Sequence, residues 1–266
     1  MGEKIGEGAF SDVHAWAPGQ VVKLFKTGAA RVTSRHEARM TRAMFAAGAP
    51  APEVFGEVTL EGRFGIVLQR LDGPTLSQLS RSGGVTRQQA GAILASLYMS
   101  LHKTPPPPEV LSLYAWMDGS LRRSSDRVPK HIATGVLTLI ERLPAEDGLC
   151  HVDLHPANVI MTADGPRILD WTSVVRAGAA LDLASCHVLL SELVPDTADD
   201  PERPRAINAA VQSEYARLSG LSPAALMAGI ERCQPIIYVF ALLGGAWRSR
   251  RAWMIQRVEA SLRAML

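Results

Sequence analysis

The pattern of apolar and polar positions changes near residue 72. Before this point the chain holds short runs rich in β-branched and aromatic residues, at 13–17, 21–25 and 64–68, which predict strands. A Pro-Gly pair separates the first two runs, as a tight turn between two strands would. Between the second and third runs, apolar residues recur at helical spacing over 34–47 and predict one helix.

After residue 72 the pattern is mostly helical. The predicted helices span 86–102, 136–143, 181–194, 207–218, 223–233 and 236–265. One exception is a short apolar run at 158–161 and another at 167–169, which predict a small hairpin. The sequence therefore predicts an α+β protein with a β-rich lobe over residues 1–72 and a larger helical lobe over residues 73–266.

Composition narrows the class of protein. The 266 residues carry a net charge of +2, which does not suggest a nucleic-acid-binding surface or a polybasic membrane anchor. Three widely spaced cysteines argue against a disulfide framework and against structural zinc. The longest apolar run, 236–247, is shorter than the roughly 20 residues of a spanning helix, and the N-terminus lacks a signal-peptide core. We expect a cytoplasmic protein without nucleic-acid or membrane partners; the sequence gives no indication of oligomeric state.

One segment concentrates candidate chemistry. Asp153 and Asn158 lie five residues apart in one loop, and the predicted hairpin leads from this loop to Asp170. A hairpin of that length turns the chain back on itself, which brings Asp170 beside the loop that holds Asp153 and Asn158. Carboxylate and amide oxygens are hard ligands that suit Mg²⁺, and a further carboxylate can accept a proton from a hydroxyl nucleophile.

These residues also carry a family resemblance. The segment CHVDLHPANVIM, followed by RILDW and LDLA, resembles the aminoglycoside phosphotransferase and choline kinase-like branch of the protein-kinase-like superfamily. The resemblance implies a two-lobed kinase-like fold, with ATP and Mg²⁺ as cofactors. It implies that Asp153 is the catalytic base, that Asn158 and Asp170 bind the metal, and that Asp182 braces the catalytic loop. Val152 departs from many relatives, which have glycine at this position.

The N-terminal third supports the same resemblance. The segment IGEGAFSDV at 5–13 resembles the glycine loop that covers the phosphates of ATP in kinases, with Gly6, Gly8, Ser11 and Val13 as its candidate nucleotide contacts. Ser11 replaces the third glycine of that loop. A hydroxyl there can still donate a hydrogen bond to a phosphate.

Further nucleotide contacts follow by resemblance. Lys23, in the second strand, is similar to the lysine that pairs with the α- and β-phosphates, and Glu37 on the next helix would be its ion-pair partner. Gln69 and Leu71 fall in a segment similar to the linker between the lobes, whose backbone hydrogen-bonds adenine.

One spacing favours a small-molecule acceptor over a protein. Eleven residues separate Asp170 from Asp182, and no Ala-Pro-Glu motif occurs, which leaves no room for a peptide-docking segment. Val152 also stands where protein kinases have an arginine. The prediction is an ATP- and Mg²⁺-dependent phosphotransferase with a small hydroxylated acceptor. A catalytically inactive nucleotide-binding regulator is the alternative, and a protein kinase is a weaker one.

The charge of the C-terminal third bears on the acceptor. After Asp182 the chain has eight acidic residues and nine arginines, a balance of +1. This balance lowers the expectation of a cationic aminoglycoside. We expect the arginine run at 248–251 to be a solvated helix face, with an anion-binding patch as the alternative. Trp247 and Trp253 are expected to pack in the helical core.

Overall fold

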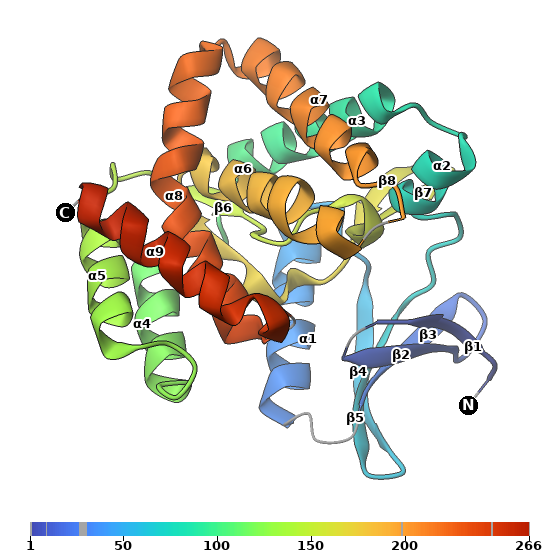
Figure 1. The fold of residues 1–266 in the computed structure, drawn as a ribbon. Coiled ribbons are helices and arrows are strands. Elements are labelled where there is room, and N and C mark those ends of the chain that lie inside the picture. The colour runs from blue at the N-terminus through green and yellow to red at the C-terminus, as the bar shows by residue number, and fades with distance from the viewer. Residues whose placement is uncertain (1, 9, 27–30, 198, 246, 266) are drawn as a thin grey trace. The chain divides into compact units, whose positions relative to one another are not determined.

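The computed structural model describes residues 2–8, 10–26, 31–197, 199–245 and 247–265 (Figure 1). The chain divides into two compact units. Residues 1–81 and 156–173 form the first, and residues 82–155 and 174–266 form the second. The predicted lobe boundary at residue 72 stays a prediction.

The first unit is built on a five-stranded antiparallel sheet with the order β1-β2-β3-β5-β4. Its strands are β1 (Lys4–Glu7), β2 (Ser11–Ala15), β3 (Gln20–Phe25), β4 (Val54–Leu60) and β5 (Arg63–Gln69). The three strands predicted from sequence are confirmed. The other two lie at the edges of the sheet, where every residue stays at least partly exposed, so they lack a sustained apolar run.

Helix α1 (Arg31–Ala46) packs on this sheet and confirms the predicted helix. Its Ala38 lies in a buried apolar cluster with residues of β3 and β5, and Val13 of β2 packs against the same cluster. The β3 and β5 members of the cluster are Val21, Phe25, Ile66 and Leu68. This packing fixes the position of α1 on the sheet, and with it the positions of the polar side chains that the helix carries.

The predicted hairpin is confirmed as β7 (Val159–Thr162) and β8 (Gly165–Ile168), and it belongs to the first unit although it lies far along the chain. Two backbone hydrogen bonds attach it: Ile168 N–H donates to Pro50 O over 2.7 Å, and Met161 N–H donates to Pro74 O over 3.0 Å. The residues that flank the hairpin are thereby brought into the unit that carries the sheet.

The second unit is helical. It contains α3 (Arg87–Lys103), α4 (Leu113–Arg123), α5 (Lys130–Glu141), α6 (Ala179–His187), α7 (Glu202–Ser219), α8 (Pro223–Gly244) and α9 (Arg251–Met265), while α2 (Leu76–Ser82) ends where this unit begins. Strands β6 (Gly148–Cys150) and β9 (Val175–Ala177) pair antiparallel within it. Helices α3 and α7 pack along each other, and α8 packs against both α6 and α9 (Figure 1).

The helix boundaries near the C-terminus correct the sequence analysis. The break expected between 233 and 236 is wrong, because α8 continues through Pro235. Proline removes one hydrogen bond of the helix, and the buried run from Ile236 to Val239 offsets this loss. The chain instead breaks after α8 at Gly245, which adopts a left-handed conformation with φ 73°.

Two further expectations are changed. Helix α4 was not predicted, and the predicted helix at 181–194 holds a π-helical turn at Val188–Leu193.

Trp247 and Trp253, which were expected to pack in the helical core, are only half-buried. Arg250 lies 4.4 Å and Arg257 5.3 Å from the Trp253 ring centroid, so this tryptophan is a partner of arginine.

Helix α8 is also long and apolar enough to cross a membrane by length and composition alone. Of its apolar window, 56% is buried inside the protein. Because the core helix of a soluble protein passes the same test, this is weak evidence for a span.

The contact between α3 and α7 yields a prediction. A Cβ at Gly91 would lie 2.4 Å from Cβ of Ala210, so Gly91→Ala is expected to lower the free energy of unfolding by about 1–3 kcal/mol. Urea denaturation followed by circular dichroism measures this change. Gly244→Ala, where nothing lies within 4 Å of the added Cβ, is the matched control. Equal stability of the two variants would contradict the close approach of the helices.

Candidate functional site

The first unit brings together three charged residues that are far apart in sequence. Lys23 Nζ on β3 lies 2.6 Å from Glu37 Oε1 on α1, and 3.7 Å from Asp170 Oδ2 just after β8. The ion pair expected between Lys23 and Glu37 is therefore present, and Asp170 joins it. A lysine between two carboxylates is held in one place and keeps its charge.

Burial and charge set the titration of this cluster. Burial alone lowers the pKa of Lys23, but the carboxylates of Asp170 and Glu37 outweigh it, so the pKa lies above the ordinary 10.5. Burial raises the pKa of Glu37 to about 6; Lys23 acts against this rise, and Asp170 adds to it. At neutral pH both partners of the ion pair are therefore charged.

The backbone around Asp170 is fixed locally. Asp170 has φ 62°, an uncommon conformation for a residue other than glycine, and its Oδ1 accepts a 2.8 Å hydrogen bond from the Thr172 hydroxyl. Leu169 N–H donates to Asn158 O over 2.9 Å, so the return of the hairpin places Asn158 and Asp170 at the same end. His36 Nε2 on α1 meets Thr172 O at 3.0 Å. This histidine joins α1 to the segment after Asp170.

The predicted glycine loop connects β1 and β2, with Ala9 outside the described residues. Gly8 N–H donates to Ser11 O over 2.8 Å, which closes the turn, and Ser11 is buried. A Cβ at Gly6 or Gly8 would meet its nearest protein atom at 3.6 Å, an ordinary contact. The fold of this chain therefore does not itself require glycine at these two positions. Val13 packs into the core cluster on the inner face of β2.

The predicted linker residues follow β5. Gln69 ends the strand and is tied twice to Glu53: its N–H donates to Glu53 O over 2.8 Å, and its Oε1 accepts from Glu53 N–H over 3.3 Å. Leu71 is half-buried. Gly73 has φ 153°, and a Cβ there would lie 2.0 Å from Met161 O. The linker can pass the β7–β8 hairpin this closely only with glycine at position 73.

The predicted catalytic Asp153 lies in the second unit, in the loop that follows β6. Its side chain is 45% exposed, and its Oδ1 lies 3.8 Å from His155 Nε2. The backbone beside it is held by side chains from elsewhere. Leu154 O accepts a 2.6 Å hydrogen bond from the buried Tyr98 hydroxyl, and Asp153 N–H donates to His151 Nδ1 over 3.2 Å. Asp153 thus projects from a fixed segment of backbone.

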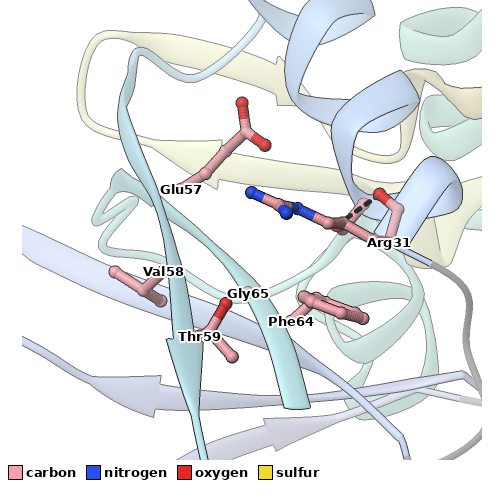
Figure 2. Close-up of a pocket in the computed structure, with 7 residues that line it drawn as sticks. Arg31, Glu57, Val58, Thr59, Phe64 and Gly65 are labelled. Carbon is pink, nitrogen blue, oxygen red and sulfur yellow. Dashed lines mark hydrogen bonds between the residues drawn. The ribbon is translucent and has the colours of Figure 1, made fainter. Parts of the chain in front are cut away.

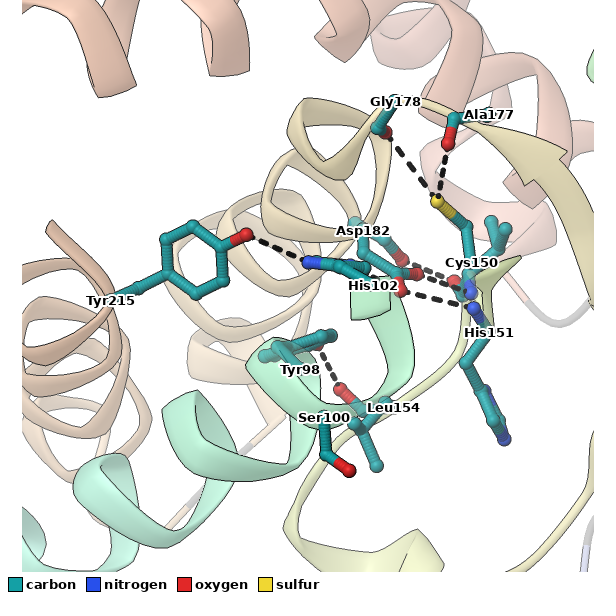
Figure 3. A network of polar contacts seen from close by, with 12 residues as sticks. Tyr98, Ser100, His102, Cys150, His151, Leu154, Ala177, Gly178, Asp182 and Tyr215 are labelled. Carbon is teal, nitrogen blue, oxygen red and sulfur yellow. Dashed lines mark hydrogen bonds and ion pairs between the residues drawn. The ribbon is translucent and has the colours of Figure 1, made fainter. Parts of the chain in front are cut away.

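Asp182 on α6 is the main support of this loop, and Figure 3 shows its contacts. Its carboxylate is fully buried and accepts backbone hydrogen bonds from His151 over 3.0 Å and from Val152 over 2.6 Å. The role that the resemblance implied for Asp182 matches these contacts. Buried N–H groups that lose such an acceptor pay their full desolvation cost.

A second layer supports Asp182. His102 Nε2 on α3 lies 3.1 Å from Asp182 Oδ2, and His102 Nδ1 lies 2.8 Å from the hydroxyl of Tyr215 on α7 (Figure 3). Because a carboxylate only accepts, Nε2 carries the proton toward Asp182, while Nδ1 shares a hydrogen bond with the tyrosine hydroxyl. Burial raises the pKa of Tyr215 to about 12, which keeps this hydroxyl a donor.

Cys150 completes a group of potential metal ligands. Ligand atoms of His102, Cys150 and Asp182 all lie within 4.8 Å of one another. However, burial raises the pKa of the Cys150 thiol well above its ordinary range, and Sγ donates to Ala177 O and Gly178 O at 3.5 and 3.4 Å. Each of the three side chains is thus engaged within the protein. Cys150 is fully buried and belongs to the core of the second unit.

Val152 has an unusual backbone. Its φ is 66°, which costs a β-branched residue roughly 1–3 kcal/mol. Asp182 accepts from its N–H, and the buried Ser185 hydroxyl donates to its carbonyl oxygen. Both peptide groups of Val152 are therefore bonded to side chains of α6.

Sequence reasoning found the charged residues of the site and missed their supports. The sequence motifs assign no role in the site to His36 or His102. Ser185 lies three residues after Asp182, and this helical spacing is the one signal that could have pointed to it. Tyr98 and Tyr215 carry no sequence signal of this role.

A separate pocket lies in the first unit between the start of α1 and strands β4 and β5 (Figure 2). Glu57 on β4 lies within 3.8 Å of Arg35 and 3.4 Å of Arg42, both on α1. The pocket is lined by Arg31, Ser34, Glu57, Val58, Thr59, Phe64 and Gly65. None of the predicted site residues lines it.

Residues 6–221 match the model of a family described as the phosphotransferase enzyme family. A search of curated proteins gave no match.

Solved structures share the fold. An aminoglycoside-3'-phosphotransferase of type VIII is 21% identical, with 87% of this chain and 91% of that chain covered and a TM-score of 0.60. A putative fructosamine-3-kinase from Haemophilus somnus 129PT is 14% identical, with 98% and 90% covered and a TM-score of 0.65. A choline/ethanolamine kinase family protein from Mesorhizobium loti is 17% identical, with 98% and 87% covered and a TM-score of 0.53. The predicted kinase-like fold is confirmed.

The pKa of Glu37 yields a pH prediction. Because the folded-state value of about 6 exceeds the ordinary 4.5, the folded protein binds more protons than the unfolded chain between these values. The stability from this group is present below pH 4.5 and is lost as the pH rises through 6. Relative to Glu37→Gln, wild type should lose about 1.5 kcal/mol between pH 4.5 and 6.5. Urea denaturation of both proteins at these pH values measures it, and a constant difference would refute it.

The support by Asp182 yields a second prediction. Asp182→Asn keeps the size of the side chain but leaves one acceptor oxygen for several donors, so the free energy of unfolding should fall by about 2–4 kcal/mol. Thermal denaturation should show a Tm lower by roughly 5–12 °C. Asp72→Asn removes an exposed carboxylate that pairs with Arg70, and it should leave the Tm nearly unchanged. An Asp182→Asn protein as stable as this control would refute the prediction.

Proposed function

Because the chain belongs to the phosphotransferase enzyme family, we propose that it transfers the γ-phosphoryl group of ATP to a hydroxyl group of a small molecule, with Mg²⁺ as cofactor. The observation that carries this proposal is the convergence of Lys23, Glu37 and Asp170 in the first unit. A part-buried lysine that is fixed between carboxylates suits the binding of phosphate oxygens. One solved relative by fold, an aminoglycoside phosphotransferase that is 18% identical with a TM-score of 0.54, was solved with ADP bound.

The glycine loop supports the same assignment. Gly6 and Gly8 have room for a Cβ within the protein, so the absence of side chains there is best explained by a ligand that approaches the backbone. In the proposal the backbone of this loop and the ammonium of Lys23 contact the phosphates. Gln69 and Leu71 provide the backbone groups that bind adenine.

The donor set near Asp170 fits magnesium. Asn158 and Asp170 offer amide and carboxylate oxygens, and the bond from Leu169 N–H to Asn158 O keeps the two residues at the same end of the hairpin. These two residues would hold Mg²⁺, which when bound would neutralise charge on the phosphates. Ion-pairing holds Lys23 charged, so its ammonium would stabilise negative charge on the phosphates together with the metal and the glycine loop.

Asp153 is the proposed base. Its carboxylate is exposed enough to meet an acceptor, while the backbone on both sides of it is fixed through Asp182 and Tyr98. It would orient the acceptor hydroxyl and take its proton as the oxygen attacks phosphorus. Catalysis would then consist of positioning together with electrostatic stabilisation.

A small acceptor is favoured over a protein. The eleven residues between Asp170 and Asp182 are taken up by a 3-10 turn, by β9 and by the start of α6. Strand β9 is paired with β6, so little of this segment remains to dock a peptide.

The enzyme is proposed to act in the cytoplasm, without nucleic acid or membrane as partner.

The acceptor need not be strongly cationic. Several acidic residues of the C-terminal third already contact arginines of their own helix or of a neighbour. Glu202 pairs with Arg205 over 2.7 Å, and Glu214 with Arg217 over 2.6 Å. Screening should therefore include sugars, homoserine and macrolides beside amino sugars and amino alcohols.

The test is a coupled ADP-release assay over this panel with Mg²⁺-ATP. Wild type should show acceptor-dependent ADP release, and Asp153→Ala should lower kcat about 10²–10⁴-fold because the base is lost. Asp126→Ala, which removes an exposed carboxylate of the second unit, is the matched control and should retain activity.

Three results would overturn the proposal. Full activity of Asp153→Ala would remove the base from the mechanism. Nucleotide binding in a thermal-shift assay, with no transfer to any acceptor, would favour a nucleotide-binding regulator instead. Transfer of ³²P to protein rather than to small molecules would indicate a protein kinase.

A further inference from the structure

We propose that Ser185 is a positioning residue for catalysis, because its hydroxyl holds Val152 in the left-handed backbone conformation that aims Asp153. The proposal rests on the proposed function for the role of Asp153. It concerns a residue to which neither the motif nor the family match gives a role.

The geometry places Asp182 and Ser185 on the two peptide groups that flank the α-carbon of Val152. Val152 N–H donates to Asp182 Oδ1 over 2.6 Å, and Val152 O accepts from the Ser185 hydroxyl. Asp182 and Ser185 are one turn apart on α6, so they share one face of the helix. Val152 is 4% exposed and Ser185 is 6% exposed, which leaves little water to replace either bond.

Both hydrogen bonds are needed because the residue between them, Val152, has a strained backbone. A valine at φ 66° is strained, and its relaxation would rotate the peptide that links it to Asp153. Asp182 fixes only the N–H side of Val152. The Ser185 hydroxyl fixes the carbonyl side, which belongs to the peptide shared with Asp153.

The helix that carries Ser185 is itself firmly anchored. All six residues from Leu181 to Cys186 are buried, and α6 packs along α8. The hydroxyl is therefore a fixed point, and the loop adapts to it. On the other side of Asp153, the bond from Tyr98 to Leu154 O provides a second fixed point.

Glycine at position 152 provides the decisive comparison. Glycine adopts positive φ without strain, so a loop with glycine there needs less restraint on its carbonyl. Removal of the hydroxyl should then matter in the valine background and matter little in the glycine background. This difference distinguishes positioning from a general loss of one buried hydrogen bond.

The experiment compares wild type, Ser185→Ala, Val152→Gly and the double variant. Hydrogen exchange of the backbone amides at 151–153 reports the loop without any turnover. It should be about tenfold faster in Ser185→Ala than in wild type, and should differ less than about threefold between Val152→Gly and the double variant. In the ADP-release assay, Ser185→Ala should lower kcat about tenfold with KM for ATP unchanged, and the glycine background should suppress this loss.

Ser120→Ala is the matched control. Ser120 is a buried serine on α4 whose hydroxyl accepts from Arg123 over 3.1 Å, and its removal should alter neither the exchange at 151–153 nor kcat. If Ser185→Ala alone did not fold while the double variant did, that rescue would support the proposal.

Three results would overturn the proposal: unchanged exchange in Ser185→Ala, the same acceleration in both backgrounds, or failure of both Ser185→Ala and the double variant to fold. Failure of the proposed function looks different. In that case no acceptor is phosphorylated by wild type, while the exchange measurements still report whether Ser185 holds the loop.

Discussion

The buried carboxylate of Asp182 is the interaction on which the catalytic loop depends. An ionised group in a protein interior is stable only when hydrogen bonds replace the water that it has lost, and here two backbone N–H groups and an imidazole do so. The carboxylate in turn provides an acceptor for these two N–H groups, which lie in a loop and not in a strand or helix. One side chain therefore converts an irregular segment into a defined support for Asp153.

The first unit solves a different electrostatic problem. Lys23 lies among carboxylates that come from a helix and from a distant hairpin. A buried ion pair of this kind contributes little net stability, because desolvation offsets attraction. Its value lies in geometry: the sheet, α1 and the hairpin hold the charges at fixed distances before any ligand arrives.

The sequence was informative wherever chemistry requires one residue type at one spacing. The segment from His151 to Asp170 predicted the hairpin, and the family resemblance implied the ion pair of Lys23 and Glu37, which is formed at 2.6 Å. It was uninformative where a bond depends on packing. The hydroxyl of Ser185 gains its role only when α6 lies against the loop, and the continuation of α8 through Pro235 depends on the burial of the residues that follow. The local conformational preferences of a sequence do not reveal such contacts between distant parts of the chain.

The contacts behind Asp182 have a consequence for the order of folding. His102 and Asp182 are 80 residues apart, and His102 and Tyr215 are 113 apart, so this network closes long loops of chain. Contacts of such separation form slowly, because loop-closure entropy must be lost before they contribute any stability. The loop that carries Asp153 thus reaches its shape only after α3, α6 and α7 have assembled. A nascent chain in which Tyr215 has not yet emerged from the ribosome can form helices and a sheet, but its catalytic loop lacks the full set of supporting contacts.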